Sequence, residues 1–441
     1  MSLSKPIEIL IAIFMVGIVI AIHEFGHFIM AKVNGVIVKE FSIGMGPRLL
    51  SKDYKGTKYS LKLLPFGGSC QMLGEAEPSD EEGSFNSKSV WKRISIVFAG
   101  PFFNFILAFL LSLIILNAIG YDPCYVTDVD ETIAEATGLQ EGDLIVRYNG
   151  HRIHIGRELN LYEVLDGIGK DPVTITFERD GKRQTVTYDP IHTAKYYIGI
   201  YYEVDGSKQG DGPMILTDVV KNGAAAEAGM QKGDRIVLIN GMPVLNVKDF
   251  VSYIEEYPFG DTPVEIGYSR DGETKIVTIT PKFNEMYSLG FSYNVNGRER
   301  IGFLKTVKYG AVEVNYWIKS VIKSLGYLLR GKASRQDIGG PVRVVSEMSD
   351  VMETSYKTDG VFYAFLNLLN WTILLSANLG VMNLLPIPAL DGGRLLIYLI
   401  EIIRGKRMSP EKEGLINFIG FVLLMILMVF ILFNDISNVF H

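Results

Sequence analysis

Four stretches of the chain are apolar over lengths that match the thickness of a lipid bilayer. They comprise residues 7–31, 94–119, 361–385 and 415–433. A helix needs about 20 predominantly apolar residues to cross the hydrocarbon core, so the pattern predicts four transmembrane helices. No small-x-small cleavage site follows the first stretch, and we therefore interpret it as a retained helix and not as a signal peptide.

The positions of the cations orient these helices. Ten Lys or Arg residues lie from Lys32 to Arg93, after the first predicted helix, and four more lie from Arg404 to Lys412, after the third. Cytoplasmic loops carry an excess of Lys and Arg, so both segments are predicted to be cytoplasmic. The N-terminus, residues 120–360 and the C-terminus then lie on the outer face of a bacterial cytoplasmic membrane.

The composition fits a membrane protein with substantial soluble parts. Of the 441 residues, 48% are hydrophobic and 21% are charged. The net charge of −6 argues against a nucleic-acid partner. Cys70 and Cys124 flank the second predicted helix, so they should lie on opposite sides of the membrane and form no disulfide.

Ionisable side chains interrupt the first apolar stretch at His23, Glu24 and His27. Histidines four residues apart lie on one face of a helix, where both imidazoles can bind one metal ion. Glu24 points about 100° away and can still reach a water on that metal. An ionisable side chain at bilayer depth costs roughly 2.5–3.5 kcal/mol, so such residues usually serve a function. We interpret the three as part of a catalytic metal site. The alternative is a histidine pair held by hydrogen bonds.

The third predicted helix runs into a segment with two prolines, Pro386 and Pro388, and then Asp391. The prolines should break the helix near its cytoplasmic end and release Asp391 from regular helical geometry. A catalytic zinc ion takes three protein ligands and leaves its fourth position to water. We therefore predict that His23, His27 and Asp391 bind one zinc ion per chain.

Residues 36–73 do not have the pattern of a plain cytoplasmic loop. Strand-like runs at 38–43, 59–64 and 69–73 alternate with turn signals such as Lys55-Gly56. This pattern predicts a small antiparallel sheet next to the helix that carries the histidines. Two interpretations stay open: an edge strand of the sheet pairs with an extended substrate, or the sheet only packs.

The region between the second and third predicted helices contains an internal repeat. The Gly-x-x-x-Gly-Asp motif at 138–143 recurs at 229–234, and Arg-Asp-Gly at 179–181 recurs at 270–272, both after 91 positions. The repeat predicts two copies of one α+β domain, at 121–205 and 206–283.

The repeated pattern resembles PDZ domains of the bacterial protease type. That resemblance implies a groove that takes an extended peptide by strand addition and holds its carboxylate with backbone N–H groups. Gly199-Ile200 and Leu289-Gly290-Phe291 match the loop that would hold the carboxylate. The alternative is a shield that excludes substrates by size and binds no ligand.

Three smaller features complete the pattern. Residues 303–329 repeat apolar positions at helical spacing, with lysines among them. Residues 301–360 are therefore predicted to be an amphipathic helical segment that lies on the membrane or on the enzyme. Asn104 and Asn117 are expected to help the second helix pack. His151, His154 and His192 are expected at the surface and not in a second metal site.

These motifs together resemble one family. His23-Glu24-x-x-His27, the Asn-x-x-Pro-x-Pro segment at 383–388 and the following Leu390-Asp391-Gly392 are all similar to motifs of the site-2 proteases, as are the tandem PDZ-like copies. The similarity covers nearly the whole chain and is strongest to the bacterial branch that regulates sigma-E. It implies a membrane zinc protease of four transmembrane helices with a re-entrant β-hairpin and two tandem PDZ-like α+β domains. By this resemblance Glu24 is the general base, and His23, His27 and Asp391 bind zinc.

The resemblance also implies how substrates are bound and chosen. Asn378 and Asn383 match asparagines that hold the substrate backbone in the family, and Gly44, Met45 and Gly46 match the re-entrant hairpin. Family substrates are single-span proteins, such as anti-sigma factors or signal-peptide remnants, that an outer site-1 type protease has already trimmed.

We therefore predict hydrolysis of a peptide bond in or near a substrate's transmembrane helix, within the membrane and toward its cytoplasmic side. Two alternatives come from other classes. One is a membrane metal transporter in which the histidines and Asp391 form a transit site. The other is a non-catalytic adaptor that presents peptides through its PDZ-like copies. Replacing Glu24 with Gln distinguishes them, because only the protease needs a base.

Overall fold

The structure is a computed structural model that describes residues 5–75, 79, 81–202, 210–295, 297–331 and 339–439. The chain divides into two compact units. The membrane unit comprises residues 1–124, 154–165 and 295–441, and the repeat unit comprises residues 125–153 and 166–294. Each unit is therefore assembled from segments that lie far apart in the sequence.

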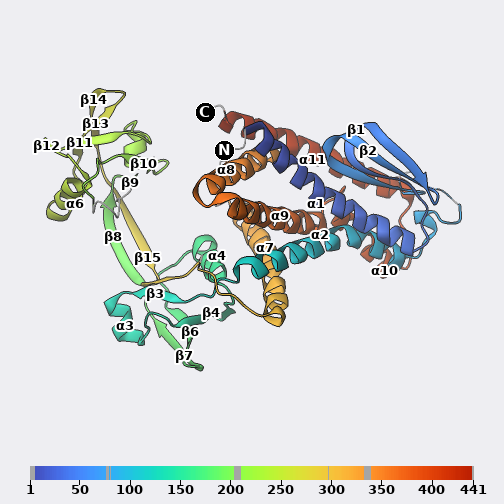
Figure 1. Ribbon diagram of the computed structural model, residues 1–441, viewed down its shortest axis with the longest axis horizontal. Coiled ribbons are helices and arrows are strands. Elements are labelled where there is room, and N and C mark those ends of the chain that lie inside the picture. The colour runs from blue at the N-terminus through green and yellow to red at the C-terminus, as the bar shows by residue number, and fades with distance from the viewer. Residues whose placement is uncertain are drawn as a thin grey trace. The chain divides into compact units, whose positions relative to one another are not determined.

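Among its described residues, the membrane unit contains four helices that are long and apolar enough to cross a bilayer. They are α1 (Lys5–Val33), α2 (Val90–Ile119), α9 (Gly360–Leu384) and α11 (Pro410–Val439). The prediction of four such helices is confirmed, and Figure 1 shows α1, α2 and α9 running alongside one another. Gly26 of α1 faces the backbone of Ala99 in α2, where a side chain would overlap the carbonyl group, so these two helices cross in close contact.

The segment that follows the two prolines corrects one expectation. A new helix, α10 (Asp391–Arg404), begins at Asp391 with Leu390 as its N-cap. Asp391 is thus the first residue of a helix, whereas the sequence predicted irregular backbone there. Tyr398 of α10 is buried in the same apolar core as Ile96 of α2, and this packing accounts for the helix once the prolines are passed.

An antiparallel hairpin of β1 (Val38–Tyr54) and β2 (Thr57–Met72) lies beside α1 (Figure 1). The pairing is irregular, because residues 40–43 of β1 pair on one side with residues 58–61 of β2 and on the other side with residues 68–71 of β2. The segment 40–43 is therefore central, and residues 68–72, here called the edge arm, form one edge. No other strand pairs with the edge arm within the described part of the chain.

The described part of the membrane unit also includes α4 (Gly156–Asp166, up to residue 165), α7 (Phe303–Leu329) and α8 (Pro341–Thr358). A short 3₁₀ helix (Phe85–Ser87) precedes α2. α7 covers the residues where the sequence shows helical spacing of apolar positions. It packs against α2 and α9.

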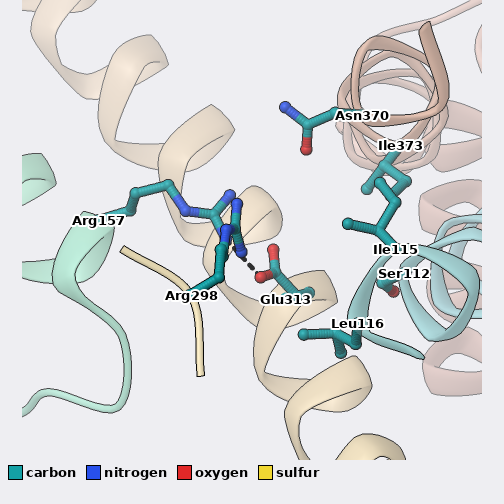
Figure 2. A pocket seen from close by; sticks show the side chains of 8 residues that line it. All are labelled: Ser112, Ile115, Leu116, Arg157, Arg298, Glu313, Asn370 and Ile373. Carbon is teal, nitrogen blue, oxygen red and sulfur yellow. Dashed lines mark hydrogen bonds and ion pairs between the residues drawn. The ribbon is translucent and has the colours of Figure 1, made fainter. Parts of the chain in front are cut away.

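Four charged side chains, of which Asp122 and Glu313 are buried, join α4 to α7, and we call Asp122, Arg157, Arg298 and Glu313 the arginine cluster. Figure 2 shows three of its members, Arg157, Arg298 and Glu313. Arg157 donates to both carboxylate oxygens of Asp122, at 2.8 and 3.0 Å, and pairs with Glu313. Arg298 donates to Asp122 at 3.3 Å. Burial raises the pKa of Glu313, although Arg157 opposes that shift. Each carboxylate of the cluster is thus paired with at least one arginine.

The repeat unit contains two four-stranded sheets with the same topology, ordered β5-β4-β6-β7 and β12-β11-β13-β14. The first sheet contains β4 (Leu144–Tyr148), β5 (His151–Arg152), β6 (Val173–Arg179) and β7 (Lys182–Tyr188). The second contains β11 (Arg235–Ile239), β12 (Met242–Pro243), β13 (Val264–Arg270) and β14 (Glu273–Ile279). The helices of this unit are α3 (Glu131–Thr137), α5 (Ala224–Glu227) and α6 (Val247–Glu256).

In each of the two copies, the repeated motifs form an equivalent ion pair between an Asp and an Arg. Asp143 accepts two hydrogen bonds from Arg179, both at 2.6 Å, and Arg179 also donates to the carbonyl of Gly138 at 2.8 Å. In the second copy Asp234 accepts from Arg270 at 2.6 and 2.7 Å, in the same arrangement. In each copy the Gly-x-x-x-Gly-Asp turn is therefore hydrogen-bonded to the last residue of a strand, the Arg of Arg-Asp-Gly.

The two copies exchange a strand. β16 (Phe291–Tyr293), which follows the second copy, pairs with β3 (Val126–Val129) of the first. β9 (Ile200–Tyr202), at the end of the expected first copy, pairs with β10 (Leu216–Val219) of the second. Between them β8 (Ile191–Tyr197) and β15 (Lys282–Ser288) form a ribbon. The expected division at 205 and 283 therefore separates strands that pair.

Candidate metal centre

Three ligand atoms from two helices converge inside the membrane unit. Nε2 of His23 and Nε2 of His27, one turn apart on α1, are 3.2 Å from each other. Oδ2 of Asp391, at the start of α10, is 3.1 Å from the first nitrogen and 3.4 Å from the second. Among the described residues, these three are the only such group of His, Cys, Asp or Glu with metal-binding spacing.

The spacing fits a zinc ion. Zinc bonds of about 2.0–2.2 Å in tetrahedral geometry place neighbouring ligand atoms roughly 3.3–3.6 Å apart. The three separations of 3.1, 3.2 and 3.4 Å lie near that range. Oδ2 of Asp391 is buried and makes no hydrogen bond, which leaves it free to coordinate an ion.

The other ring nitrogens of the two histidines are held by α2. Nδ1 of His27 is 2.9 Å from the carbonyl oxygen of Ile96, and a carbonyl only accepts, so the proton is on Nδ1 and Nε2 keeps a lone pair. Nδ1 of His23 faces the amide of Asn104 at 3.3 Å, and Oδ1 of Asn104 is otherwise buried without a donor. The amide orientation that turns Oδ1 toward Nδ1 satisfies both groups and frees Nε2 of His23 for a metal.

α2 also leaves room for the imidazoles. A Cβ atom at Gly100 would overlap Nε2 of His27 and crowd Nε2 of His23. Any other residue at this position would therefore push the two rings apart. Sequence reasoning assigned Asn104 to helix packing and gave Gly100 no part in the site. The polar amide inside a transmembrane helix was the available signal, because such groups are costly unless they have a partner.

A cavity of about 400 Å³ opens onto the three ligand atoms. The lining residues include Glu24 from α1, Cys70 and Met72 from the edge arm, and Asn383 from the end of α9. Gly68 of the edge arm passes directly over Glu24, so a Cβ there would lie 3.2 Å from Cγ of Glu24. The candidate base thus lies against the edge arm, at the wall of the cavity that opens onto the ligand atoms.

Some predicted site residues lie elsewhere. Asn378 is on α9 and is not among the residues that line the cavity. Gly44, Met45 and Gly46 lie in β1 beyond its central segment, and they do not line the cavity either. Gly44 and Gly46 have φ values of +86° and +85°, so they provide the bend of the hairpin.

The remaining described histidines have other surroundings. Nδ1 of His154 lies 3.0 Å from a carboxylate oxygen of Glu158, and His192 stacks on Tyr287 with ring centroids 4.8 Å apart. His151 is exposed in β5. Both cysteines are free and buried.

Comparison with known proteins places this site in a family. The model of peptidase family M50 matches residues 11–427, which include all three ligand positions. The chain belongs to peptidase family M50. Its relatives are named as zinc metalloproteases, and this M50 member is accordingly a zinc metalloprotease.

Several bacterial relatives match this M50 peptidase over almost their full length. Zinc metalloprotease RasP of Geobacillus kaustophilus is 32% identical over 96% of each chain. Regulator of sigma-W protease RasP of Bacillus subtilis is 30% identical, with 96% of this chain and 97% of the relative covered. Regulator of sigma-E protease RseP of Salmonella typhimurium is 31% identical over 96% of each.

Among solved structures, the HtrA3 PDZ domain bound to a phage-derived ligand is similar to a part of this M50 peptidase. The similarity covers 22% of this chain and 93% of that domain, at 20% identity and a TM-score of 0.18.

Proposed function

We propose that this M50 peptidase cleaves peptide bonds in or near the transmembrane helices of single-span substrates, at the centre formed by His23, His27 and Asp391. The observation that carries the proposal is Oδ2 of Asp391, which is buried, faces two imidazole nitrogens and has no hydrogen-bond donor. A buried carboxylate oxygen without a partner is costly unless a cation completes its surroundings.

Each residue has a distinct role in this proposal. Zinc, when bound by His23, His27 and Asp391, supplies a Lewis acid and lowers the pKa of a water to about 7. Glu24 accepts the proton from the attacking water at its carboxylate and returns it to the leaving amine. Asn104 and the carbonyl of Ile96 keep the two imidazoles in the tautomers that present Nε2.

The edge arm is the element that best fits a substrate strand. A helical substrate must unwind before its carbonyl groups are accessible, and it then needs new backbone hydrogen bonds. Residues 68–72 have one edge without a strand partner in the described chain, and Cys70 and Met72 face the cavity. Strand addition here would carry the substrate past Glu24.

We assign the other predicted substrate contacts according to where they lie. Asn383 lines the cavity and can hold the substrate backbone with its side-chain amide. Asn378 precedes Asn383 on α9 and does not line the cavity, so its contact would be with a more distant part of the substrate. Gly44, Met45 and Gly46 shape the hairpin that presents the edge arm, and we propose that the hairpin re-enters the membrane from the cytoplasmic side.

The relatives' names support a class of substrate. They describe regulators of sigma-E and sigma-W, so we propose that a single-span anti-sigma factor or a signal-peptide remnant is cut here. The protein would act in the bacterial inner membrane after an outer site-1 type protease has trimmed the substrate. The two repeat copies, which we propose to be PDZ-like and to lie on the outer face, would exclude substrates that still carry bulky outer domains.

The strand exchange suggests how to test this exclusion. Tyr197 of β8 lies opposite Lys282 of β15, so an Asn-Gly turn can join them and remove residues 198–281 as one piece. This deletion removes the second copy and leaves the first copy, with β16 still in place for β3. If the second copy contributes to the filter, the shortened protein should cut an untrimmed substrate that the full chain leaves intact. Equal resistance in both proteins would contradict a filter that needs the second copy.

The central experiment uses purified full-length protein in proteoliposomes with a transmembrane-helix substrate. The proposal predicts one zinc per chain and cleavage that stops with a chelator and returns with zinc. Glu24→Gln should keep the zinc and abolish cleavage. A transporter would move zinc across the vesicle membrane with Gln at position 24, and an adaptor would contain no stoichiometric zinc; either result would contradict the proposal.

A further inference from the structure

Two oppositely charged side chains share the cavity with the ligand atoms, and the mechanism above does not use them. Nη1 of Arg394 donates to Oε1 of Glu75 at 2.5 Å, although the residues are 319 positions apart. Both line the cavity. Their side chains are 28% and 21% exposed, so the pair lies at the cavity wall and not on the open surface.

Arg394 is rigidly linked to the metal ligand Asp391. The two residues are three positions apart in the first turn of α10, so they lie on one face of the helix. The backbone N–H of Arg394 donates to the carbonyl of Leu390 at 3.3 Å. One turn further on, Tyr398 is buried in the core with 1% of its surface exposed. Movement of the Arg394 guanidinium would therefore need rotation of its own side chain.

Glu75 is linked just as closely to the edge arm. It follows Met72, the last residue of β2, after a tight turn. The turn is fixed because the N–H of Leu73 donates to the carbonyl of Ile37 at 2.9 Å and because Gly74 has a φ of +74°. A side chain at Gly74 would overlap Ser84, so this turn has little room to move.

The pair therefore connects the two halves of the proposed site. One half is the helix that begins with Asp391, and the other is the arm on which we propose that the substrate forms a strand. Arg394 is the only Lys or Arg among the described residues that line the cavity. A guanidinium group can form two parallel hydrogen bonds to a carboxylate, so their relative orientation is defined. A single apolar contact would not define an orientation.

We propose that the Glu75–Arg394 bridge fixes the position of the edge arm relative to the metal ligands and so determines which peptide bond of the substrate is cut. Arg394 and Glu75 are positioning residues in this proposal. The inference rests on the proposed strand addition to residues 68–72. A strand advances about 3.3 Å per residue and alternates its faces, so a slip by two residues presents the next equivalent bond about 6.6 Å away.

The test measures cleavage position as well as rate. Full-length wild type, Glu75→Gln, Arg394→Gln and the double variant are incubated in proteoliposomes with a transmembrane-helix substrate that the wild type cuts at one bond. Product masses give the cut sites, metal analysis gives bound zinc, and initial rates give kcat and KM. Arg407→Gln is the matched control, because Arg407 bonds to Asn86 at 2.6 and 2.7 Å and does not line the cavity.

The proposal predicts that each single variant keeps its zinc and produces additional cuts, mainly two residues from the original bond. We expect kcat/KM at the original bond to fall about 10-fold, mostly through KM. The double variant should resemble either single variant, because both changes break one bridge. Arg394→Lys should keep most cleavage at the original bond, and Arg407→Gln should behave as wild type.

Other outcomes would overturn the inference. A large loss of kcat in Arg394→Gln, with a single cut and an unaffected Glu75→Gln, would show that Arg394 acts on the reacting atoms. Single cuts at normal rates in all variants would show that the bridge does not select the bond. If Arg394→Gln does not fold, Glu75→Gln and Arg394→Lys still decide between these outcomes. Absence of zinc or cleavage in the wild type would instead contradict the proposed function.

Discussion

The metal centre and the arginine cluster both contain buried carboxylate oxygens in the membrane unit, yet they are built in opposite ways. In the arginine cluster Asp122 and Glu313 are paired with Arg157, and Asp122 is also paired with Arg298. At the metal centre Oδ2 of Asp391 faces two nitrogen lone pairs and has no donor. The charges of one group balance each other, whereas the other group presents acceptors that a bound cation would complete.

This difference distinguishes a cluster that holds structural elements together from a site that binds a ligand. Buried charges that are fully paired hold elements together, and removing one partner leaves the others uncompensated. Buried acceptors that converge on one point are unfavourable for folding, and a protein keeps them where a ligand completes them. Substitutions in the cluster should therefore change stability, whereas substitutions in the centre should change zinc binding and cleavage.

The largest expected effect is that of Asp391→Asn. The amide keeps the volume but removes the charge that binds the cation, so we expect zinc affinity and cleavage to fall by more than about 100-fold. The thermal midpoint of the zinc-free protein should not fall, because an uncompensated carboxylate is removed. Metal analysis measures the bound zinc, and thermal unfolding measures the midpoint. A lower midpoint with zinc retained would show that Asp391 has a structural role instead.

Arg157→Met should have the reverse effect. It leaves Asp122 and Glu313 buried with one fewer cation, which costs about 3–5 kcal/mol in the free energy of unfolding. Zinc content per folded molecule should be unchanged. Arg183→Met is the control, since Arg183 pairs with Glu178 at an exposed position where an ion pair contributes less than about 1 kcal/mol. Equal unfolding midpoints for the two variants would refute the distinction.

Asn104→Ala tests the residues behind the centre. Loss of the amide leaves Nδ1 of His23 without its partner, and such losses typically reduce metal affinity 10–100-fold. Competition with a zinc chelator measures the change. Asn117→Ala, an exposed position on the same helix, should leave the affinity unchanged. Should both variants bind zinc as the wild type does, Asn104 would only pack, as the sequence first indicated.

The smallest effect is expected in the repeat unit. Burial acts to raise the pKa of Asp234, but the hydrogen bonds from Arg270 and from the N–H of Gln231 together outweigh it and lower this pKa. The ionised carboxylate therefore stabilises the fold above its ordinary pKa of about 3.9, and this contribution is lost as the pH falls below that value. Arg270→Met should lower the free energy of unfolding near pH 7 and lower it progressively less in acid.

Hydrogen exchange of the amides in β13 and β14 measures this last change locally. Lys275→Met is a suitable control, because Lys275 contributes only a weak coulombic interaction with Asp234. A difference between Arg270→Met and the wild type that persists unchanged at low pH would contradict the assignment of the stabilisation to the ion pair.

Features encoded by neighbouring residues could be predicted from the sequence. The four membrane-crossing helices follow from length and hydropathy, and the shared face of His23 and His27 follows from helical spacing. Asp391 was reached by counting the ligands that zinc requires. The structure brings these three residues together.

Features that depend on distant contacts could not be predicted. α10 begins at Asp391 because Tyr398 finds a core made by other segments. The edge arm lies at 68–72 because residues 40–43 pair on both sides. Gly100 and Asn104 gain their significance only where α2 crosses α1. The strand exchange in the repeat unit is likewise invisible in the 91-residue offset.

X-ray absorption at the zinc edge of Glu24→Gln protein tests the central claim most directly, because this variant should bind the ion without turning over. The account predicts one zinc per chain in a four-coordinate shell of nitrogen and oxygen atoms, with the scattering pattern of two imidazoles, which drops to one in Glu24→Gln combined with His23→Ala. A sulfur ligand, or an unchanged spectrum after the His23 substitution, would contradict it.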